Sequence, residues 1–190
     1  MAPNRVLVSG IAQQVEQVTA ALLAKGTAVT PVVDLAEIPA ACTAAGPDAF
    51  DAYVQLPSTF TVRGSTAIQR VHHFYAEGVL ARFGALDTAL GSLVTGARVV
   101  FVMGTLPPEA ATIDDREARK ALTRVLAHAA RADAADRLVT RVLEAGAAAE
   151  DIAFVALGGD LARRELMERL DHLTDADWRT ELLGLAAVQT

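Results

Sequence analysis

Ser9 and Gly10 end an apolar run near the start of the chain, and the stretch after them has the pattern of an amphipathic helix. Such a turn can present backbone N–H groups to a phosphate at the N-terminus of the helix. It continues as "IAQQ" and has no second or third glycine, so the two glutamines hinder the close approach of a pyrophosphate. Ser9, Gly10 and Ile11 are therefore either part of a dinucleotide site or a tight strand-to-helix turn.

Asp34 follows a second β-branched run and comes about 24 residues after Gly10, near the spacing at which an acidic residue binds a ribose 2′-hydroxyl. An acidic residue at the end of a strand is also common in the absence of any ligand. If a cofactor binds, we expect NAD(P), held by Ser9, Gly10, Ile11 and Asp34. The missing glycines favour a protein that binds no cofactor.

No metal site is expected from the remaining reactive residues. His72 and His73 are adjacent, and neighbouring side chains on a helix point about 100° apart, so they do not share a face. The single cysteine, Cys42, excludes an internal disulfide and a cysteine-rich zinc site. The sequence also contains no G-x-S-x-G motif for a nucleophilic serine.

Runs of apolar residues alternate with helical patterns along the chain. Apolar runs predict five strands, at 5–9, 28–33, 50–56, 98–103 and 152–157. Helices are predicted at 12–25, 35–45 with an interruption at Pro39, 65–93 with a break near Gly84, 115–145, 160–171 and 175–187.

This alternation predicts an α/β protein, a three-layer doubly wound parallel sheet of about five strands. The flavodoxin-like order 2-1-3-4-5 is the simplest Rossmann-type arrangement of five such strands. We expect one reduced Rossmann-like domain over residues 1–190, with the helices at about 160–187 as a C-terminal extension.

The composition limits the class of protein. The chain has 190 residues, of which 52% are hydrophobic, and a net charge of −6. These values are typical of a globular protein and disfavour nucleic acid as a partner. No apolar run has the roughly 18 residues of a membrane helix, and the N-terminus lacks a signal peptide. We therefore expect a cytoplasmic protein without a membrane partner.

The order of these segments resembles the short-chain dehydrogenase/reductase family over most of residues 5–160. "RVLVSG" stands at the first strand and "FDAYVQLPS" at the strand that carries the Asn-Asn-Ala-Gly motif. "GARVVFVMGT" stands at the strand of the catalytic serine and "DDREARKALTRVLAHAA" at the helix of the Tyr-x-x-x-Lys motif. The stretch between Asp34 and Phe50 is too short for the usual helix-strand-helix, so one strand of the full fold is missing.

The chemical residues of that family are almost all absent. Lys120 stands at the position of the family lysine, but Arg116 replaces the tyrosine and cannot act as a neutral acid near pH 7. Asn4 is the only asparagine, so the family's asparagine motifs are missing. Thr105 falls near the family serine and could supply a hydroxyl. If the protein is active, the resemblance implies Thr105 and Lys120 as the residues near the substrate.

The pattern is also similar to the cofactor-free N-terminal domain of high-molecular-weight 3-oxoacyl-ACP reductases of actinobacteria, which has a reduced Rossmann unit and a glycine-poor first turn. That resemblance implies a structural or oligomerising role.

The two long helices predict a protein–protein interface. In short-chain reductases the helices at corresponding positions pack in pairs across a twofold axis. Here the helices at about 65–93 and 115–145 carry many alanines and leucines, and small residues permit close helix approach. The sequence predicts a homodimer or hetero-oligomer through them. The alternative is that these faces only cover the sheet of a monomer.

These observations favour a catalytically degenerate, reductase-like protein that acts through oligomerisation or partner binding. An atypical NAD(P)-dependent oxidoreductase is the alternative. A further alternative is a non-catalytic subunit of a larger fatty-acid or polyketide type reductase assembly.

Overall fold

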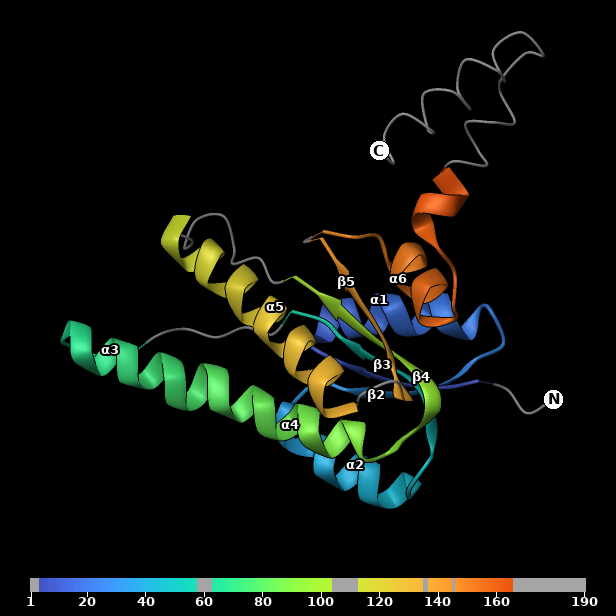
Figure 1. The fold of residues 1–190 in the computed structure, drawn as a ribbon, viewed down its shortest axis with the longest axis horizontal. Coiled ribbons are helices and arrows are strands. Elements are labelled where there is room, and N and C mark those ends of the chain that lie inside the picture. The colour runs from blue at the N-terminus through green and yellow to red at the C-terminus, as the bar shows by residue number, and fades with distance from the viewer. Residues whose placement is uncertain (1–3, 58–62, 104–112, 135–136, 145, 166–190) are drawn as a thin grey trace, which may run out of the picture. The chain divides into compact units, whose positions relative to one another are not determined.

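The computed structural model describes residues 4–57, 63–103, 113–134, 137–144 and 146–165 (Figure 1). Five parallel strands form one sheet in the order β2-β1-β3-β4-β5. The predicted α/β class and strand order are confirmed. In this order the sheet grows outward in both directions from β1 and β3, which places the topological switch point between them.

The first four strands lie where apolar runs predict them. Their bounds are β1(Arg5–Ser9), β2(Ala28–Val32), β3(Phe50–Gln55) and β4(Leu93–Val102). β4 begins five residues earlier than predicted, because Leu93 pairs with Phe50 and an irregularity in the ladder follows before Arg98 pairs with Ala52. Pro31 lies in β2, an edge strand, where its missing N–H costs no sheet hydrogen bond.

The predicted fifth strand at 152–157 is wrong. Residues 152–156 belong to α6(Ala149–Ala156), which buries Ile152, Ala153, Val155 and Ala156 against the sheet, and Leu157 is its C-cap. A short apolar run is compatible with either a buried strand or a buried helix, and two acidic residues in the first turn favour the helix. The fifth strand is β5(Val139–Leu143), which the sequence placed inside a helix at 115–145.

Helices cover both faces of the sheet (Figure 1). α1(Ala12–Leu23) and α6 contact each other on one face. The other face is covered by α2(Ile38–Ala45), α4(Ala81–Leu90) and α5(Ile113–Ala134). Pro39 lies in the first turn of α2 and begins this helix instead of interrupting it, after a short 3-10 helix, η1(Leu35–Glu37).

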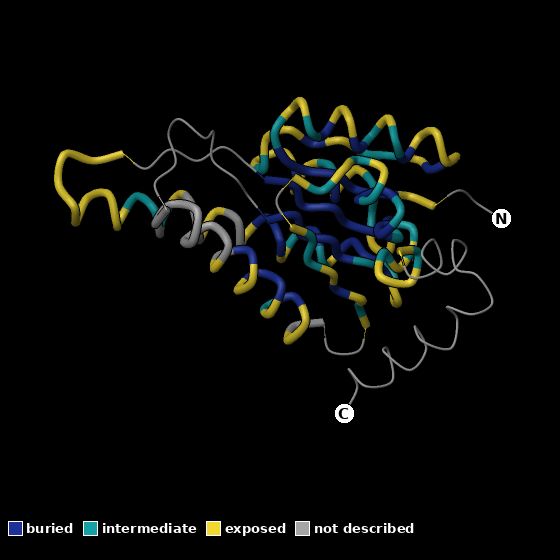
Figure 2. The backbone as a smooth tube through the Cα atoms, turned by 90° about the horizontal axis from the view of Figure 1, so that it is seen from above, coloured by how far each residue is buried: buried dark blue, intermediate teal, exposed yellow. Residues whose placement is uncertain are grey.

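The helix predicted at 65–93 is one continuous helical run, and Gly84 does not break it. It consists of α3(Ala67–His73), the π-helical segment η2(Phe74–Leu80) and α4. We call α3 and η2 together the helical arm. Figure 2 shows the arm extending past the sheet, with exposed residues at its far end.

The chain divides into two compact units, Met1–Gly158 and Gly159–Thr190. Residues 161–165 of the second unit are helical, as predicted. The rest of the predicted helices at 160–171 and 175–187 lies outside the described residues.

Candidate functional site

The carboxyl ends of β1, β2 and β3 meet at the turn that the sequence singled out. Gly10 donates its N–H to the Val32 carbonyl at 3.3 Å, and Ile11 donates its N–H to the Pro57 carbonyl at 3.1 Å. Leu56 donates its N–H to the Ser9 carbonyl at 2.7 Å. These three bonds tie the turn to both neighbouring strands, so the N–H groups of Gly10 and Ile11 already have acceptors within the protein.

Gly10 is required by close packing at this place. Its φ is +151°, a value that side chains rarely adopt, and a Cβ built on it would lie 2.5 Å from Leu56 Cβ and 3.1 Å from the Pro57 carbonyl oxygen. In dinucleotide-binding folds the first glycine of this turn allows the tight bend and the second lets the pyrophosphate approach; this chain has the first, Gly10, and no second. Here the room beside Gly10 is filled by the end of β3.

Asp34 is exposed and lies just after β2, on the same edge of the sheet as Gly10. Its Oδ1 accepts the Ala36 N–H at 2.9 Å and so caps the 3-10 helix η1. This cap is a local structural role for the residue that the sequence proposed as a ribose ligand.

The structure does not describe the side chains of Thr105 and Lys120, the two residues proposed to act near a substrate. Thr105 lies outside the described residues. Lys120 lies on α5, but its side chain is not among those that the structure describes.

A buried polar cluster on β1 and β3 was not predicted from the sequence. Ser9 Oγ lies 2.8 Å from the Tyr53 hydroxyl oxygen, and the Tyr53 hydroxyl donates to Gln55 Oε1 at 3.4 Å. Ser9 and Tyr53 are both fully buried, so solutes do not reach their hydroxyls. The strand order 2-1-3 was the available signal, because it makes Ser9 and Gln55 neighbours in the sheet.

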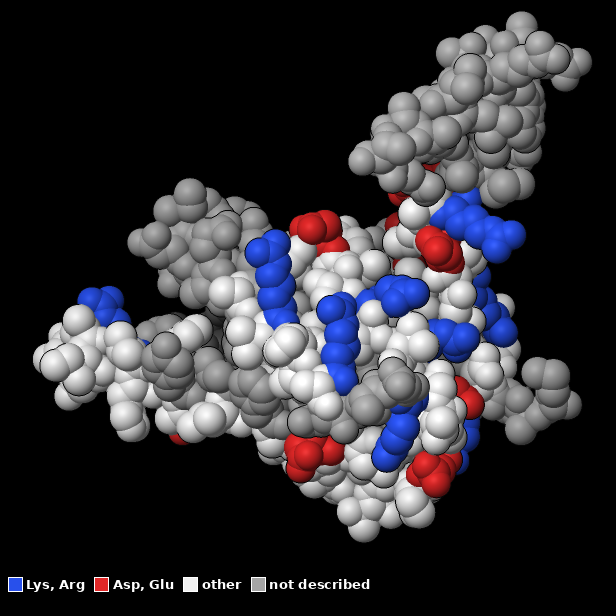
Figure 3. Space-filling view, in the orientation of Figure 1, with Lys and Arg blue, Asp and Glu red and all other residues white. Residues whose placement is uncertain are grey.

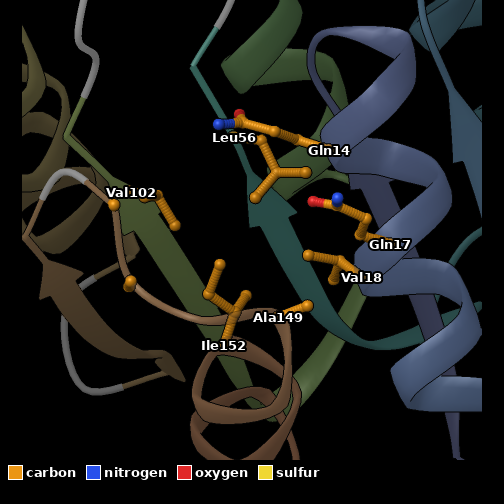
Figure 4. A pocket seen from close by; sticks show the side chains of 9 residues that line it. Gln14, Gln17, Val18, Leu56, Val102, Ala149 and Ile152 are labelled. Carbon is orange, nitrogen blue, oxygen red and sulfur yellow. The ribbon is translucent and has the colours of Figure 1, made fainter.

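A small cavity lies between α1 and α6, beside the carboxyl ends of β3 and β4 (Figure 4). The side chains of Gln14 and Gln17 extend from α1 toward Leu56 at the edge of this cavity. Its lining consists of Gln14, Gln17, Val18, Leu56, Val102, Gly146, Ala147, Ala149 and Ile152. Its volume of about 40 Å³ suits water-sized guests, whereas ligand pockets span roughly 300–1,000 Å³.

The two adjacent histidines lie at the end of α3, in the helical arm. His73 Nδ1 accepts the Arg63 N–H at 3.3 Å, and His72 is exposed. Within the described part of the chain, no group of three or more His, Cys, Asp or Glu residues could hold a metal ion. The described helices also include none that is long and apolar enough to span a membrane.

Comparison with known proteins supports the fold and goes no further. No family model matches the sequence, and no curated protein matches it. The structure of BdcA (YjgI) from E. coli superposes with a TM-score of 0.53 at 14% identity, over 80% of this chain and 89% of that chain.

Two other solved structures match with a TM-score of 0.39. A de novo designed Rossmann 2x3 fold protein is 13% identical, over 84% of this chain and 94% of that chain. The flavodoxin-like domain of a Synechococcus protein is 16% identical, over 78% of this chain and 92% of that chain. The likeness to BdcA agrees with the Rossmann-like strand order found here.

Proposed function

We propose that this protein is a catalytically degenerate, reductase-like Rossmann domain that binds no dinucleotide and acts by associating with itself or with a partner. The observation that carries this proposal is the packing of Leu56 and Pro57 against Gly10. The dinucleotide site of a Rossmann fold lies at the switch point of the sheet, outside the carboxyl ends of its central strands. In this chain the turn at that point is bonded to β2 and β3.

The cavity beside this turn is too small for a dinucleotide. A dinucleotide needs a cleft of several hundred Å³, and the cavity between α1 and α6 measures about 40 Å³. Opening the turn would break the Ile11 N–H bond to Pro57 and separate Gly10 from Leu56.

The helical arm supports the association half of the proposal. Ile68 is 83% exposed and Leu80 is 65% exposed, and Val71 is exposed between them. Val125 on α5 is exposed as well. Apolar side chains of this size gain roughly 1.5–3 kcal/mol each when fully buried. A second copy of the chain, packed arm against arm across a twofold axis, would bury them.

One observation favours the alternative, an atypical NAD(P)-dependent oxidoreductase. The N-cap residue of α1, Ile11, makes no side-chain cap, and an uncapped helix N-terminus attracts anions such as phosphate. In that alternative the first turn of α1, beyond Ile11, would hold the phosphate.

A further alternative is a non-catalytic subunit of a larger reductase assembly, which is a special case of partner binding. Co-purification with a catalytic chain would reveal it.

Titration of the purified protein with NADH and NADPH separates the two functions. We expect no binding at millimolar cofactor by calorimetry or nicotinamide fluorescence, and a dimer mass by light scattering. Binding at micromolar cofactor would establish the alternative. A monomer mass at high micromolar protein would remove self-association and leave a different protein as the partner.

A further inference from the structure

Among the strands that the structure describes, β5 lies at the edge of the sheet and pairs only with β4, so one side of its backbone faces away from these strands. The Leu143 carbonyl accepts the Met103 N–H at 3.0 Å and therefore points toward β4. Backbone groups of successive strand residues point to opposite sides, so those of Thr140 and Val142 point outward. The Thr140 carbonyl accepts Arg141 Nη1 at 3.1 Å, which agrees with this assignment.

The surface around this edge is basic. Arg131 at the end of α5, Arg137 just before β5 and Arg141 within β5 are all exposed. Figure 3 shows basic side chains gathered over β5 and α5, on a chain whose net charge is −6. None of these three arginines forms an ion pair with another residue whose side chain the structure describes. These arginines therefore attract negative charge, although one exposed acidic residue, Glu144, directly follows β5.

The opposite edge of the sheet is protected in a different way. β2 carries Pro31, which cannot donate to an added strand. β5 contains no proline, and its outward carbonyl at Thr140, a residue that is 5% exposed, accepts the side chain of Arg141. A carboxylate that binds this guanidinium would release the carbonyl for a main-chain hydrogen bond.

We propose that β5 binds an extended acidic segment of a partner protein as a sixth strand, with carboxylates of that segment on Arg137 and Arg141. Main-chain bonds to Thr140 and Val142 would supply affinity, and the arginines would supply selectivity. Pairing of β5 with β5 of a second copy is disfavoured, because a twofold axis at this strand would bring the two Arg141 side chains together. This surface is separate from the turn at Gly10 and from the helical arm, so the proposal goes beyond the proposed function.

The test uses the full chain and three labelled eight-residue peptides in fluorescence anisotropy. The first alternates valine and glutamate, and the second alternates valine and lysine. The third repeats the first with an N-methyl group on every backbone nitrogen, which removes the donors from both edges. We expect the acidic peptide to bind, the basic peptide not to bind, and the N-methylated peptide to bind about tenfold more weakly or worse.

Protein variants locate the site. Arg141→Glu should weaken binding of the acidic peptide about tenfold or more, and Lys25→Glu, the same charge change at an exposed site after α1, should leave it within about twofold. Amide shifts on binding should centre on residues 139–143. Absence of acidic-peptide binding would overturn the proposal and assign the arginines to keeping the edge unpaired. Equal binding of the N-methylated peptide, or shifts centred elsewhere, would also overturn strand addition.

Discussion

Two regions of the molecule differ in burial. The turn between β1 and α1 is buried and hydrogen-bonded within the protein, whereas the helical arm is largely exposed. At the turn, Ser9 is fully buried, Leu56 is buried, and the N–H groups of Gly10 and Ile11 are bonded to carbonyls of neighbouring strands. At the arm, by contrast, every residue from Arg63 to His72 is exposed, both in the segment before α3 and in α3 itself. Ile68, an apolar residue, is 83% exposed there.

The difference separates two kinds of binding. At the turn after β1, Leu56 and Pro57 pack closely against Gly10, and we propose that this packing excludes a dinucleotide. In the helical arm the chain leaves apolar side chains exposed, and we propose that this surface binds another protein. Exposed apolar side chains that cluster on one element mark interaction surfaces. The comparison therefore favours association over cofactor chemistry.

The largest expected effect comes from filling the space beside Gly10. Gly10→Ala places a Cβ 2.5 Å from Leu56 Cβ in a backbone conformation that alanine rarely adopts, so we expect a loss of about 3 kcal/mol in the free energy of unfolding. Gly26→Ala is the matched control, since Gly26 also has positive φ but nothing within 4 Å. It should cost about 1 kcal/mol. Equal losses in urea denaturation would mean that the turn is not closely packed.

The helical arm is tested by charge. Ile68→Glu combined with Leu80→Glu should raise the dimer dissociation constant about tenfold or more, because burial of either carboxylate at an interface is costly. The free energy of unfolding of the monomer should change by less than about 0.5 kcal/mol.

Leu23→Glu is the control for the arm, since Leu23 is 56% exposed on α1. Sedimentation equilibrium over a range of protein concentrations measures the dimer dissociation constants of the wild type, the arm variant and Leu23→Glu. If Leu23→Glu and the arm variant weaken association equally, the interface does not lie on the arm.

The buried cluster should have a smaller effect. Tyr53→Phe removes the hydroxyl beside Ser9 Oγ, and we expect a loss of about 1–2 kcal/mol in the free energy of unfolding. Ser9→Ala in the Tyr53→Phe background should cost less than Ser9→Ala alone, because both partners of the bond are then gone. Strictly additive losses in thermal unfolding would contradict an energetic coupling between the two hydroxyls.

The smallest effect is expected at the start of the helical arm. Thr66 Oγ1 accepts the Gln69 N–H at 3.2 Å, and Gln69 Oε1 accepts the Thr66 N–H at 3.3 Å. Thr66→Ala should destabilise the first turn of α3 by about 1 kcal/mol and speed amide exchange at 67–73, while global unfolding is unchanged. Thr66→Ser should restore protection. A matching loss in global stability would show that the arm is part of the core.

The sequence predicts the first four strands because each is an apolar run that ends near a glycine, proline or polar residue. Their order is predicted separately, from the alternation of strands with helices. It misplaces the fifth, since the apolar run at Ile152 suits a buried helix equally well and β5 contains the charged Arg141. For the same reason the length of the helix before β5 is overestimated.

The candidate site is predicted only in part. The missing glycines are visible in the sequence, and they predict a turn unsuited to a pyrophosphate. The contact between Gly10 and Leu56 and the pairing of Ser9 with Tyr53 depend on the register between β1 and β3. Local sequence patterns do not contain that register, because it is set by packing between segments far apart in the chain.

The most direct test of the central claim is calorimetric titration of the wild-type chain with NADH and NADPH, followed by amide shifts of Ser9, Gly10 and Ile11 in the presence of millimolar cofactor. A turn closed by Leu56 and Pro57 predicts no heat of binding and unchanged shifts at these three residues. A saturable heat at micromolar cofactor, with shifts centred on Gly10, would contradict it.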